Sequence, residues 1–367
     1  MLLELLACPA CQGALGPEFL CAGCGTRYLA HDGVADLRFG GDARTERVRG
    51  FYSHAPFPGY RPGDNLEALR ARAEKSEFAR LLDAAIAPDA RILEIGCGTG
   101  QMSLYLARGE RRVIGADLTR ASLLLGAAAA RRFGVTGVQF VETDLHRPGL
   151  RAGAFDLVYC SGVLHHTPDP RRAFAGLVPL MRPGGMLVIG LYNAFARIPL
   201  RLRRLVARLS GNRWIPCDPV LRDRKSEPAR REAWLRDQYR HPEEHRHTVA
   251  EIRGWFVENG IEFVRTYPSL LLGEESGALF AADADYWPFE AWLSQIGWMA
   301  SLGYEGGLFV TVGRRPSGGT APPARLCQSK LRSSVIALTS CFDKLSMRIN
   351  LIPRPGRTTL PLTTVEG

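Results

Sequence analysis

The sequence predicts an α/β fold, in which a doubly wound and mostly parallel sheet follows a small cysteine-rich module. Five short apolar segments alternate with segments of helical periodicity, and the connections between them are short. A glycine-rich turn separates the first of these predicted strands from a helix. Two Cys-x-x-Cys motifs lie near the amino end. Together these observations divide the 367 residues into a small module and a large core domain.

The glycine-rich turn lies within residues 91–106. Its apolar, partly β-branched start is typical of a strand buried on both faces. Three glycines follow at every second position: Gly96, Gly98 and Gly100. A strand, a tight glycine turn and a helix form the opening of a nucleotide site, because the ligand must approach bare backbone. The third glycine of the dinucleotide fingerprint would fall at Gln101, so that fingerprint is not matched.

Two further predicted strands each end in an acid. Residues 112–117 end at Asp117, which lies 21 residues after Gly96, close to the spacing at which an acid meets ribose hydroxyls. Residues 138–144 end at Asp144. Strands at residues 155–160 and 186–191 complete the set of five. The acids are therefore expected at the carboxyl edge of the sheet, beside the glycine turn.

The motif Glu94-x-Gly96-x-Gly98-x-Gly100 resembles the first motif of the class I S-adenosylmethionine (SAM) methyltransferases. The strings at residues 161–170 and 181–185 are similar to those of the ubiquinone/menaquinone-methyltransferase-like branch, and the likeness covers roughly residues 75–193. It implies a Rossmann-like sheet, SAM as the cofactor, and an Asp144 that meets the adenine amino group. The cofactor-binding residues it implies are Glu94, Gly96, Cys97, Gly98, Gly100, Gln101, Asp117, Leu118, Asp144, Leu145 and Ser161.

The amino-terminal module, residues 1–38, contains the two Cys-x-x-Cys motifs. Their thiolates are four candidate ligands of one closed, structural zinc site: Cys8, Cys11, Cys21 and Cys24. So short a segment buries little apolar surface, and the metal would supply the missing folding energy. The module resembles the small zinc-ribbon proteins that activate methyltransferases, and the zinc ribbon of some bacterial ribosomal-RNA guanine methyltransferases.

Residues 39–64 are expected to be a linker that packs over the cofactor mouth, or a plain connector. Prolines and glycines interrupt the segment, yet it contains Phe51, Tyr52, Phe57 and Tyr60. The methyltransferase domain is then expected over residues 65–314. It should begin with one helix, capped by Asn65 and running to about Ile86.

Two insertions are expected within this domain, the first at residues 194–247. It should contain a helix over residues 197–209, with apolar residues on one face and an arginine stripe on another: Arg197, Arg201, Arg204 and Arg208. The stripe fits an RNA backbone, an anionic membrane surface or a solvated face. Further along, Tyr239 and His241 are candidates for contact with the substrate.

The second insertion, residues 268–306, is rich in aromatic residues and lies between the two strands that should close the sheet, at residues 262–267 and 307–313. It is interpreted as the roof of an apolar pocket, as a dimer face or as ordinary core. Residues 315–367 begin with a linker composition and are expected to be weakly ordered.

The chemistry expected of this site is simple, because the methyl group of SAM is already activated. The protein must align an acceptor and exclude water. His165 and His166, just past the fourth strand, are the candidate bases, and Tyr192 should face the cleft from the end of the fifth strand.

The acceptor is left open by the sequence. A small or lipid-like molecule methylated at oxygen, nitrogen or carbon is the first hypothesis, an RNA substrate the second and a non-catalytic SAM-binding scaffold the third. The net charge of +10 weakly favours an anionic partner, either nucleic acid or peripheral membrane contact. The odd count of nine cysteines, the absence of a long apolar run and the poor signal-peptide character of the amino end predict a cytoplasmic protein.

Overall fold

The computed structural model describes residues 2–40, 46, 49–50, 59–211, 214–215, 218, 221–222, 228–239, 244–271, 277–284, 286–302 and 306–318. Most of the predicted tail and the aromatic residues Phe51, Tyr52 and Phe57 of the predicted lid lie outside these ranges. In the described part of the chain, no helix combines the length and the apolar character that crossing a membrane requires.

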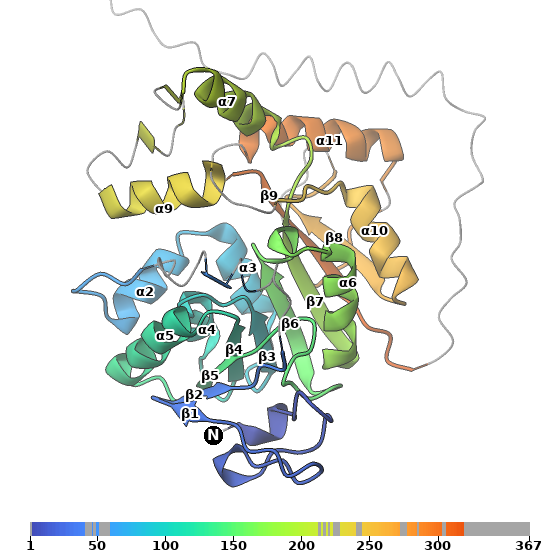
Figure 1. Ribbon diagram of the computed structural model, residues 1–367. Coiled ribbons are helices and arrows are strands. Elements are labelled where there is room, and N and C mark those ends of the chain that lie inside the picture. Colours follow the sequence, from blue (N-terminus) through green and yellow to red (C-terminus); the bar gives the residue numbers. More distant parts are fainter. Residues whose placement is uncertain are drawn as a thin grey trace, which may run out of the picture. The chain divides into compact units, whose positions relative to one another are not determined.

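One nine-stranded sheet organises the described chain (Figure 1). Its order is β1-β2-β5-β4-β3-β6-β7-β9-β8. The strands are β1 (Ala30–His31), β2 (Val34–Asp36), β3 (Arg91–Ile95), β4 (Arg112–Asp117), β5 (Val138–Glu142), β6 (Phe155–Ser161), β7 (Met181–Tyr192), β8 (Glu262–Tyr267) and β9 (Leu308–Arg314). The strands from β2 to β7 are parallel, whereas β9 is antiparallel to both β7 and β8. The predicted α/β class and the closing strand pair are confirmed.

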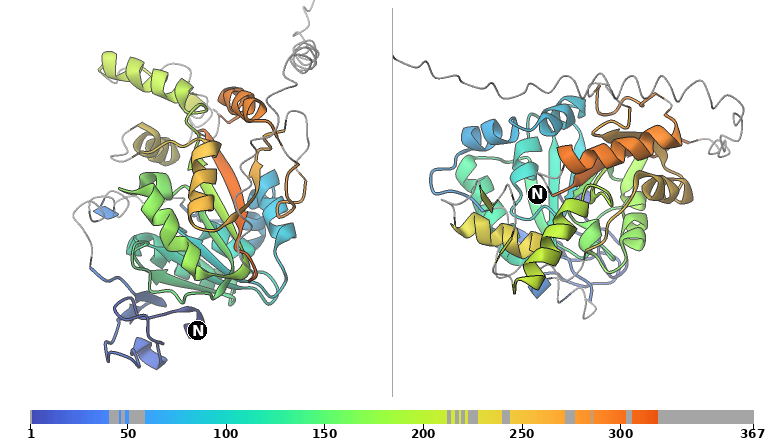
Figure 2. Two further views of the ribbon diagram at one scale, coloured as in Figure 1. Left: turned by 90° about the vertical axis from the view of Figure 1, so that its right-hand side faces the viewer. Right: turned by 90° about the horizontal axis from the view of Figure 1, so that it is seen from above.

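Helices cover both faces of the sheet (Figures 1 and 2). Buried residues of α3 (Glu77–Ala85), α4 (Gln101–Leu106) and α5 (Arg120–Phe133) belong to one apolar core, and those of α6 (Pro170–Leu177) and α10 (Val249–Glu258) to the other. Further helices in the described ranges are α2 (Leu66–Ala73), α7 (Ile198–Leu209), α9 (Pro228–Tyr239) and α11 (Pro288–Ser301). Single 3-10 turns lie at Leu3–Leu5, Pro17–Phe19, Leu164–His166 and Val178–Leu180.

The amino-terminal module is part of this sheet rather than a separate body. Its strand β2 pairs in parallel with β5, and Leu37 donates its N–H to Glu142 O at 2.8 Å. Residues 143–154, all of which the structure describes, form no helix between β5 and β6. Apolar residues of the module occupy the core on that side, among them Leu5, Leu6 and Phe19. The module therefore covers a face of the sheet that would otherwise expose apolar surface to water.

The prediction of one helix between Asn65 and Ile86 is wrong, because the structure has two helices there. Asn65 accepts a hydrogen bond from Ala68 N at 2.7 Å and begins α2 as predicted. Ser76 then accepts from Ala79 N and begins α3. A side-chain oxygen that satisfies a free backbone N–H stabilises a helix start, so Ser76 favours a second start over continuation.

Helix α7 leaves most of its predicted apolar face exposed, whereas part of the predicted arginine stripe is buried. Arg197 just precedes it and is only 1% exposed, with its guanidinium 3.7 Å above the Tyr192 ring and 2.5 Å from Glu244. Arg204 also contacts Glu244, at 2.6 Å. Half of the predicted arginine stripe is therefore internal and unavailable to RNA or lipid. The buried charge of Arg197 is stabilised because the Glu244 carboxylate neutralises it. Helical periodicity could not predict this burial, because Glu244 lies outside the helix and far along the chain.

Candidate functional site

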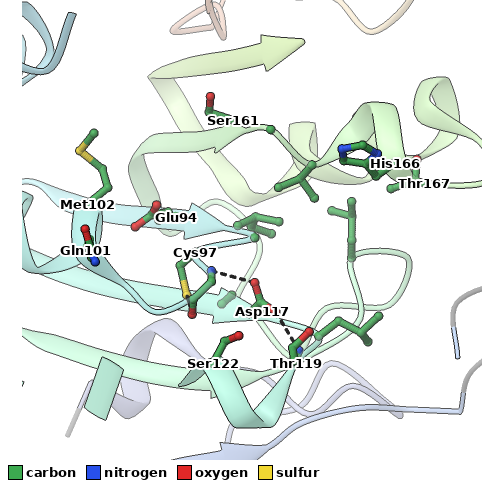
Figure 3. Close-up of a pocket in the computed structure, with 18 of the residues that line it drawn as sticks. Glu94, Cys97, Gln101, Met102, Asp117, Thr119, Ser122, Ser161, His166 and Thr167 are labelled. Carbon is green, nitrogen blue, oxygen red and sulfur yellow. Dashed lines mark hydrogen bonds between the residues drawn. The ribbon is translucent and has the colours of Figure 1, made fainter. Parts of the chain in front are cut away.

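A cavity of about 630 Å³ opens at the carboxyl ends of the central strands. Figure 3 shows its residues, with Gln101 and Met102 on one side of the view and His166 and Thr167 on the other. Of the predicted cofactor residues, all except Gly100 line it: Glu94, Gly96, Cys97, Gly98, Gln101, Asp117, Leu118, Asp144, Leu145 and Ser161. A parallel sheet places its site at this edge because successive strand ends and their loops meet there.

The glycine turn forms the floor of this cavity, and two of its positions admit only glycine. Gly96 has φ +71°, and a Cβ there would lie 2.0 Å from the Val163 side chain. Gly100 has φ +75°, and a Cβ there would lie 2.3 Å from the Phe140 ring. Gly100 therefore acts behind the cavity, by letting the turn pack against Phe140. Both positions combine a left-handed backbone with close approach, which is the combination that requires glycine.

Asp117 is the residue that holds the glycine turn. Its carboxylate accepts the N–H of Gly98 at 2.8 Å and the N–H of Thr119 at 2.7 Å, the two bonds drawn in Figure 3. Burial raises the pKa of Asp117, and the two backbone donors oppose that shift. One carboxylate thus fixes the turn after β3 and the turn after β4 together.

Glu94 lies at the end of β3, facing the cavity, and is nearly inaccessible to water. Ser103 of α4 donates its hydroxyl to the Glu94 carboxylate. Burial raises the pKa of Glu94 to about 7, and the bond from Ser103 only partly offsets this. A proton therefore stays on Glu94 to a much higher pH than on an exposed glutamate.

The two predicted histidines have different positions. His166 lines the cavity, whereas His165 is fully buried behind it. The His165 ring lies 3.8 Å from the Tyr192 ring and 4.3 Å from the His166 ring. Tyr192 also lines the cavity, and its hydroxyl accepts a bond from Gln238 at 2.8 Å. His165 thus packs against the two side chains that face the ligand space.

With this geometry established, comparison with known proteins identifies the central domain. A family model described as a methyltransferase domain matches residues 93–189. This chain contains a methyltransferase domain. The matched range includes the glycine turn, Asp117 and both histidines, so the cavity is the site of that domain. The predicted class, a SAM-dependent methyltransferase, is confirmed at the level of the domain.

Several relatives match part of this chain. An uncharacterized protein of Synechococcus sp. is 29% identical in an alignment of 253 positions that covers 61% of this chain and 60% of that protein. The ubiquinone biosynthesis O-methyltransferase of Cronobacter sakazakii is 32% identical over 107 residues, 29% of this chain and 44% of that protein. The chain therefore spans less than two thirds of the curated relatives it matches. Magnesium protoporphyrin IX methyltransferase of Synechocystis covers 74% of this chain and 99% of its own at 16% identity, but its TM-score of 0.44 supports no functional comparison.

Part of the cavity wall comes from segments that no sequence motif predicted to be part of the site. Trp234 and Gln238 come from α9, Arg72 from α2 and Leu308 from β9. The described residues of the second insertion, 268–306, do not line this cavity. Of its three interpretations, they therefore give no support to the roof. The first insertion supplies the roof instead, because Arg204 of α7 donates to Gln238 O and so holds α9 at the cavity.

The two predicted substrate contacts are Tyr239 and His241. Tyr239 is described, but it does not belong to the cavity lining. Its hydroxyl donates to Asp218 at 2.6 Å, and burial raises its pKa. This bond ties α9 to the preceding segment of the insertion. His241 lies outside the described residues.

The described end of the predicted lid contacts the glycine turn. Tyr60 donates its hydroxyl to Thr99 O at 2.7 Å, and Gln101 donates to Gly59 O at 3.0 Å. The described end of the connector therefore packs against the glycine turn that forms the cavity floor. A lid over the cofactor stays a prediction.

The four predicted metal ligands of the amino-terminal module form one cluster. Their sulfur atoms all lie within 4.8 Å of one another. The Sγ atoms of Cys8 and Cys24 are 3.7 Å apart, and those of Cys11 and Cys21 are 3.5 Å apart. A tetrahedral ion with Zn–S bonds of about 2.3 Å requires sulfurs about 3.8 Å apart. The geometry is compatible with zinc, and four sulfurs leave no position for catalysis.

Replacing Asp117 with alanine is expected to weaken SAM binding about a hundredfold. Each hydrogen bond to a charged group contributes about 1.5–3 kcal/mol, and this substitution frees both turns that border the cofactor space. Isothermal calorimetry measures the change. Asp117→Asn, which keeps one acceptor oxygen, should lose less, and Asp89→Ala on an exposed turn should bind normally. Equal affinities for Asp117→Ala and Asp89→Ala would contradict this role.

Replacing Glu94 with glutamine is expected to flatten the pH dependence of stability. The folded protein keeps the proton up to about pH 7, whereas the unfolded chain releases it near 4.5. The free energy of unfolding should therefore fall as the pH rises between these values, by about 3 kcal/mol. Urea unfolding at several pH values measures the fall. The fall in the free energy of unfolding should disappear in Glu94→Gln and persist in Glu67→Gln, a change on the exposed face of α2. If the free energy of unfolding varied with pH in the same way in both variants, Glu94 would not be its source.

Proposed function

We propose that this protein transfers the methyl group of SAM to a hydroxyl oxygen of a small or lipid-like acceptor. The supporting observation is the cavity of about 630 Å³, which continues from the glycine turn to His166 and Tyr192. Its lining includes apolar side chains, among them Met102, Val163 and Leu308, so it suits an acceptor with a hydrophobic body. The name of the ubiquinone biosynthesis relatives, O-methyltransferases, favours oxygen as the acceptor atom.

The cofactor residues are proposed to act through the glycine turn and the two acids. Asp117 keeps the turn closed and offers its carboxylate to the ribose hydroxyls, as its place at the end of β4 favours. Asp144 accepts the N–H of His146 at 2.8 Å, which orients the loop proposed to meet the adenine. SAM supplies a methyl group that its sulfonium already activates. The protein contributes orientation and exclusion of water.

His166 is the proposed base for the acceptor hydroxyl. Imidazole is the side chain best suited to accept a proton near neutral pH, and His166 is the described histidine of the 3-10 turn after β6 that reaches the cavity. His165 and Tyr192 support it by packing, and Gln238 holds the Tyr192 hydroxyl. His165 is proposed as a positioning residue.

The cysteine cluster is proposed to hold one structural zinc ion. Gly13 supports this assignment, because a Cβ there would lie 3.2 Å from the Sγ atoms of both Cys11 and Cys21. The ion would secure the module that pairs with β5.

Methyl-labelled SAM tests the proposed acceptor class. The full-length protein is incubated with lipid extract, aqueous metabolites or total RNA from a strain that lacks it. Label in the organic phase that resists alkaline hydrolysis of esters, but that hydriodic acid releases as methyl iodide, supports a methyl ether on a lipid-like acceptor. Label that resists both treatments indicates methylation at carbon and contradicts oxygen as the acceptor atom. Label that is lost with RNase supports the RNA hypothesis instead. Absence of SAM binding at micromolar concentration in calorimetry would favour the scaffold and overturn the proposal.

A further inference from the structure

Helix α7 exposes the face that its sequence would be expected to bury. Leu202, Leu205 and Leu209 are 60%, 54% and 80% exposed. They recur at spacings of three and four residues and therefore share one face of the helix. Trp214, just beyond the helix, is 62% exposed. Surface helices normally bury such a stripe against the protein, so this one is placed to meet an apolar environment outside it.

The charges beside the stripe indicate what kind of surface it meets. Arg201 and Arg208 are exposed on the same helix, and residues 198–209 contain no acid. A leucine face bordered by arginines is the pattern of helices that lie in the interface of an anionic bilayer. Exposed leucines gain nothing from a nucleic-acid backbone, which is bound through charge.

A second set of exposed apolar residues lies at the same end of the molecule. Helix α11 presents Trp287, Phe289 and Trp292, which are all about half exposed, and the rings of the last two stack at 5.9 Å. Figure 1 and the left view of Figure 2 both place α7 and α11 at this end, beyond the carboxyl edge of the sheet. Tryptophan and phenylalanine are favoured at the level of lipid headgroups, where an aromatic ring meets both apolar and polar surroundings.

We infer that α7 docks this protein onto an anionic lipid surface, with Leu202, Leu205 and Leu209 inserted and Arg201 and Arg208 at the headgroups. Contacts on the opposite face of α7 hold the helix in place. Arg204 contacts Glu244 and the Gln238 carbonyl, and the Gln238 side chain lines the cavity. The docking helix and the cavity roof are therefore held together by the same contacts.

Vesicle flotation tests the inference with the full-length protein, in the absence of SAM and acceptor. Binding is expected to vesicles of phosphatidylcholine with phosphatidylglycerol, and to be much weaker with phosphatidylcholine alone. Each leucine should contribute about tenfold to partitioning, so Leu205→Ser with Leu209→Ser should lower it about a hundredfold. Arg208→Ala should lower it about fivefold.

The matched control is Leu29→Ser, a change of an equally exposed leucine in the amino-terminal module. It should float like the unchanged protein, and every variant should keep its SAM affinity in calorimetry. This separates loss of docking from loss of the fold or of the proposed methyl transfer. Equal binding of the leucine variants and the control would overturn the inference. So would a dimer in solution that the leucine changes dissociate, or RNA that displaces the protein from vesicles.

Discussion

Cys8→Ser is expected to release zinc from the amino-terminal module and to weaken SAM binding at a distance. Four thiolates contribute about 10–16 kcal/mol of apparent binding free energy in small zinc modules, and so short a segment has little other source of stability. Without the ion, the pairing of β2 with β5 should be lost. Metal analysis gives the zinc content, and hydrogen exchange at β5 reports the exposed strand.

The effect should reach the cofactor because the module and the cavity share a loop. Thr143 donates its hydroxyl to Leu37 O at 3.1 Å and accepts from Gly149 N at 2.9 Å. Ala7 donates its N–H to Gly149 O at 3.1 Å. Thr143 and Asp144 line the cavity, so freeing this loop removes part of the preformed site.

Tyr28→Phe is the matched control for Cys8→Ser. It removes a hydroxyl 3.0 Å from the Cys8 sulfur but keeps all four thiolates, so zinc and cofactor affinity should persist. Returning zinc to chelator-treated, unchanged protein should restore binding. Full affinity in a zinc-free Cys8→Ser protein would show that the module and the site are independent.

His166→Gln is expected to lower the rate of methyl transfer about a hundredfold or more while SAM affinity stays within about twofold. Proton transfer by a positioned base contributes about 10²–10⁴-fold, and glutamine keeps hydrogen-bonding capacity but cannot take up the proton. The rate is measured as label transferred from SAM into the acceptor pool that supports turnover.

The control for this variant is His31→Gln, an exposed histidine of β1 in the amino-terminal module. His165→Gln should lower kcat less than His166→Gln, because His165 acts through packing. A His166→Gln enzyme with an unchanged rate and pH profile would rule out a histidine base and would favour an acceptor that needs none.

The carboxyl-edge residues were predictable because local sequence encodes them. Gly96, Asp117 and Asp144 each lie at or just beyond the end of a short apolar strand, and parallel strands bring such ends together whatever the rest of the chain does. The four-cysteine cluster was predictable for the same reason, since two Cys-x-x-Cys turns direct four sulfurs toward one point. Prediction from local sequence failed between Asn65 and Ile86, where the apolar spacing continued across a break that Ser76 stabilises.

By itself, the sequence determined the α/β class, the glycine turn with its acids, and the four-cysteine cluster. Only the tertiary structure decided that the amino-terminal module joins the sheet, that α9 contributes to the cavity wall, and that α7 turns its leucines outward. The physical reason is the range of the interactions. Strand ends and Cys-x-x-Cys turns depend on neighbours in the chain, whereas Arg197 is buried because of Glu244, 47 positions away, which no local periodicity encodes.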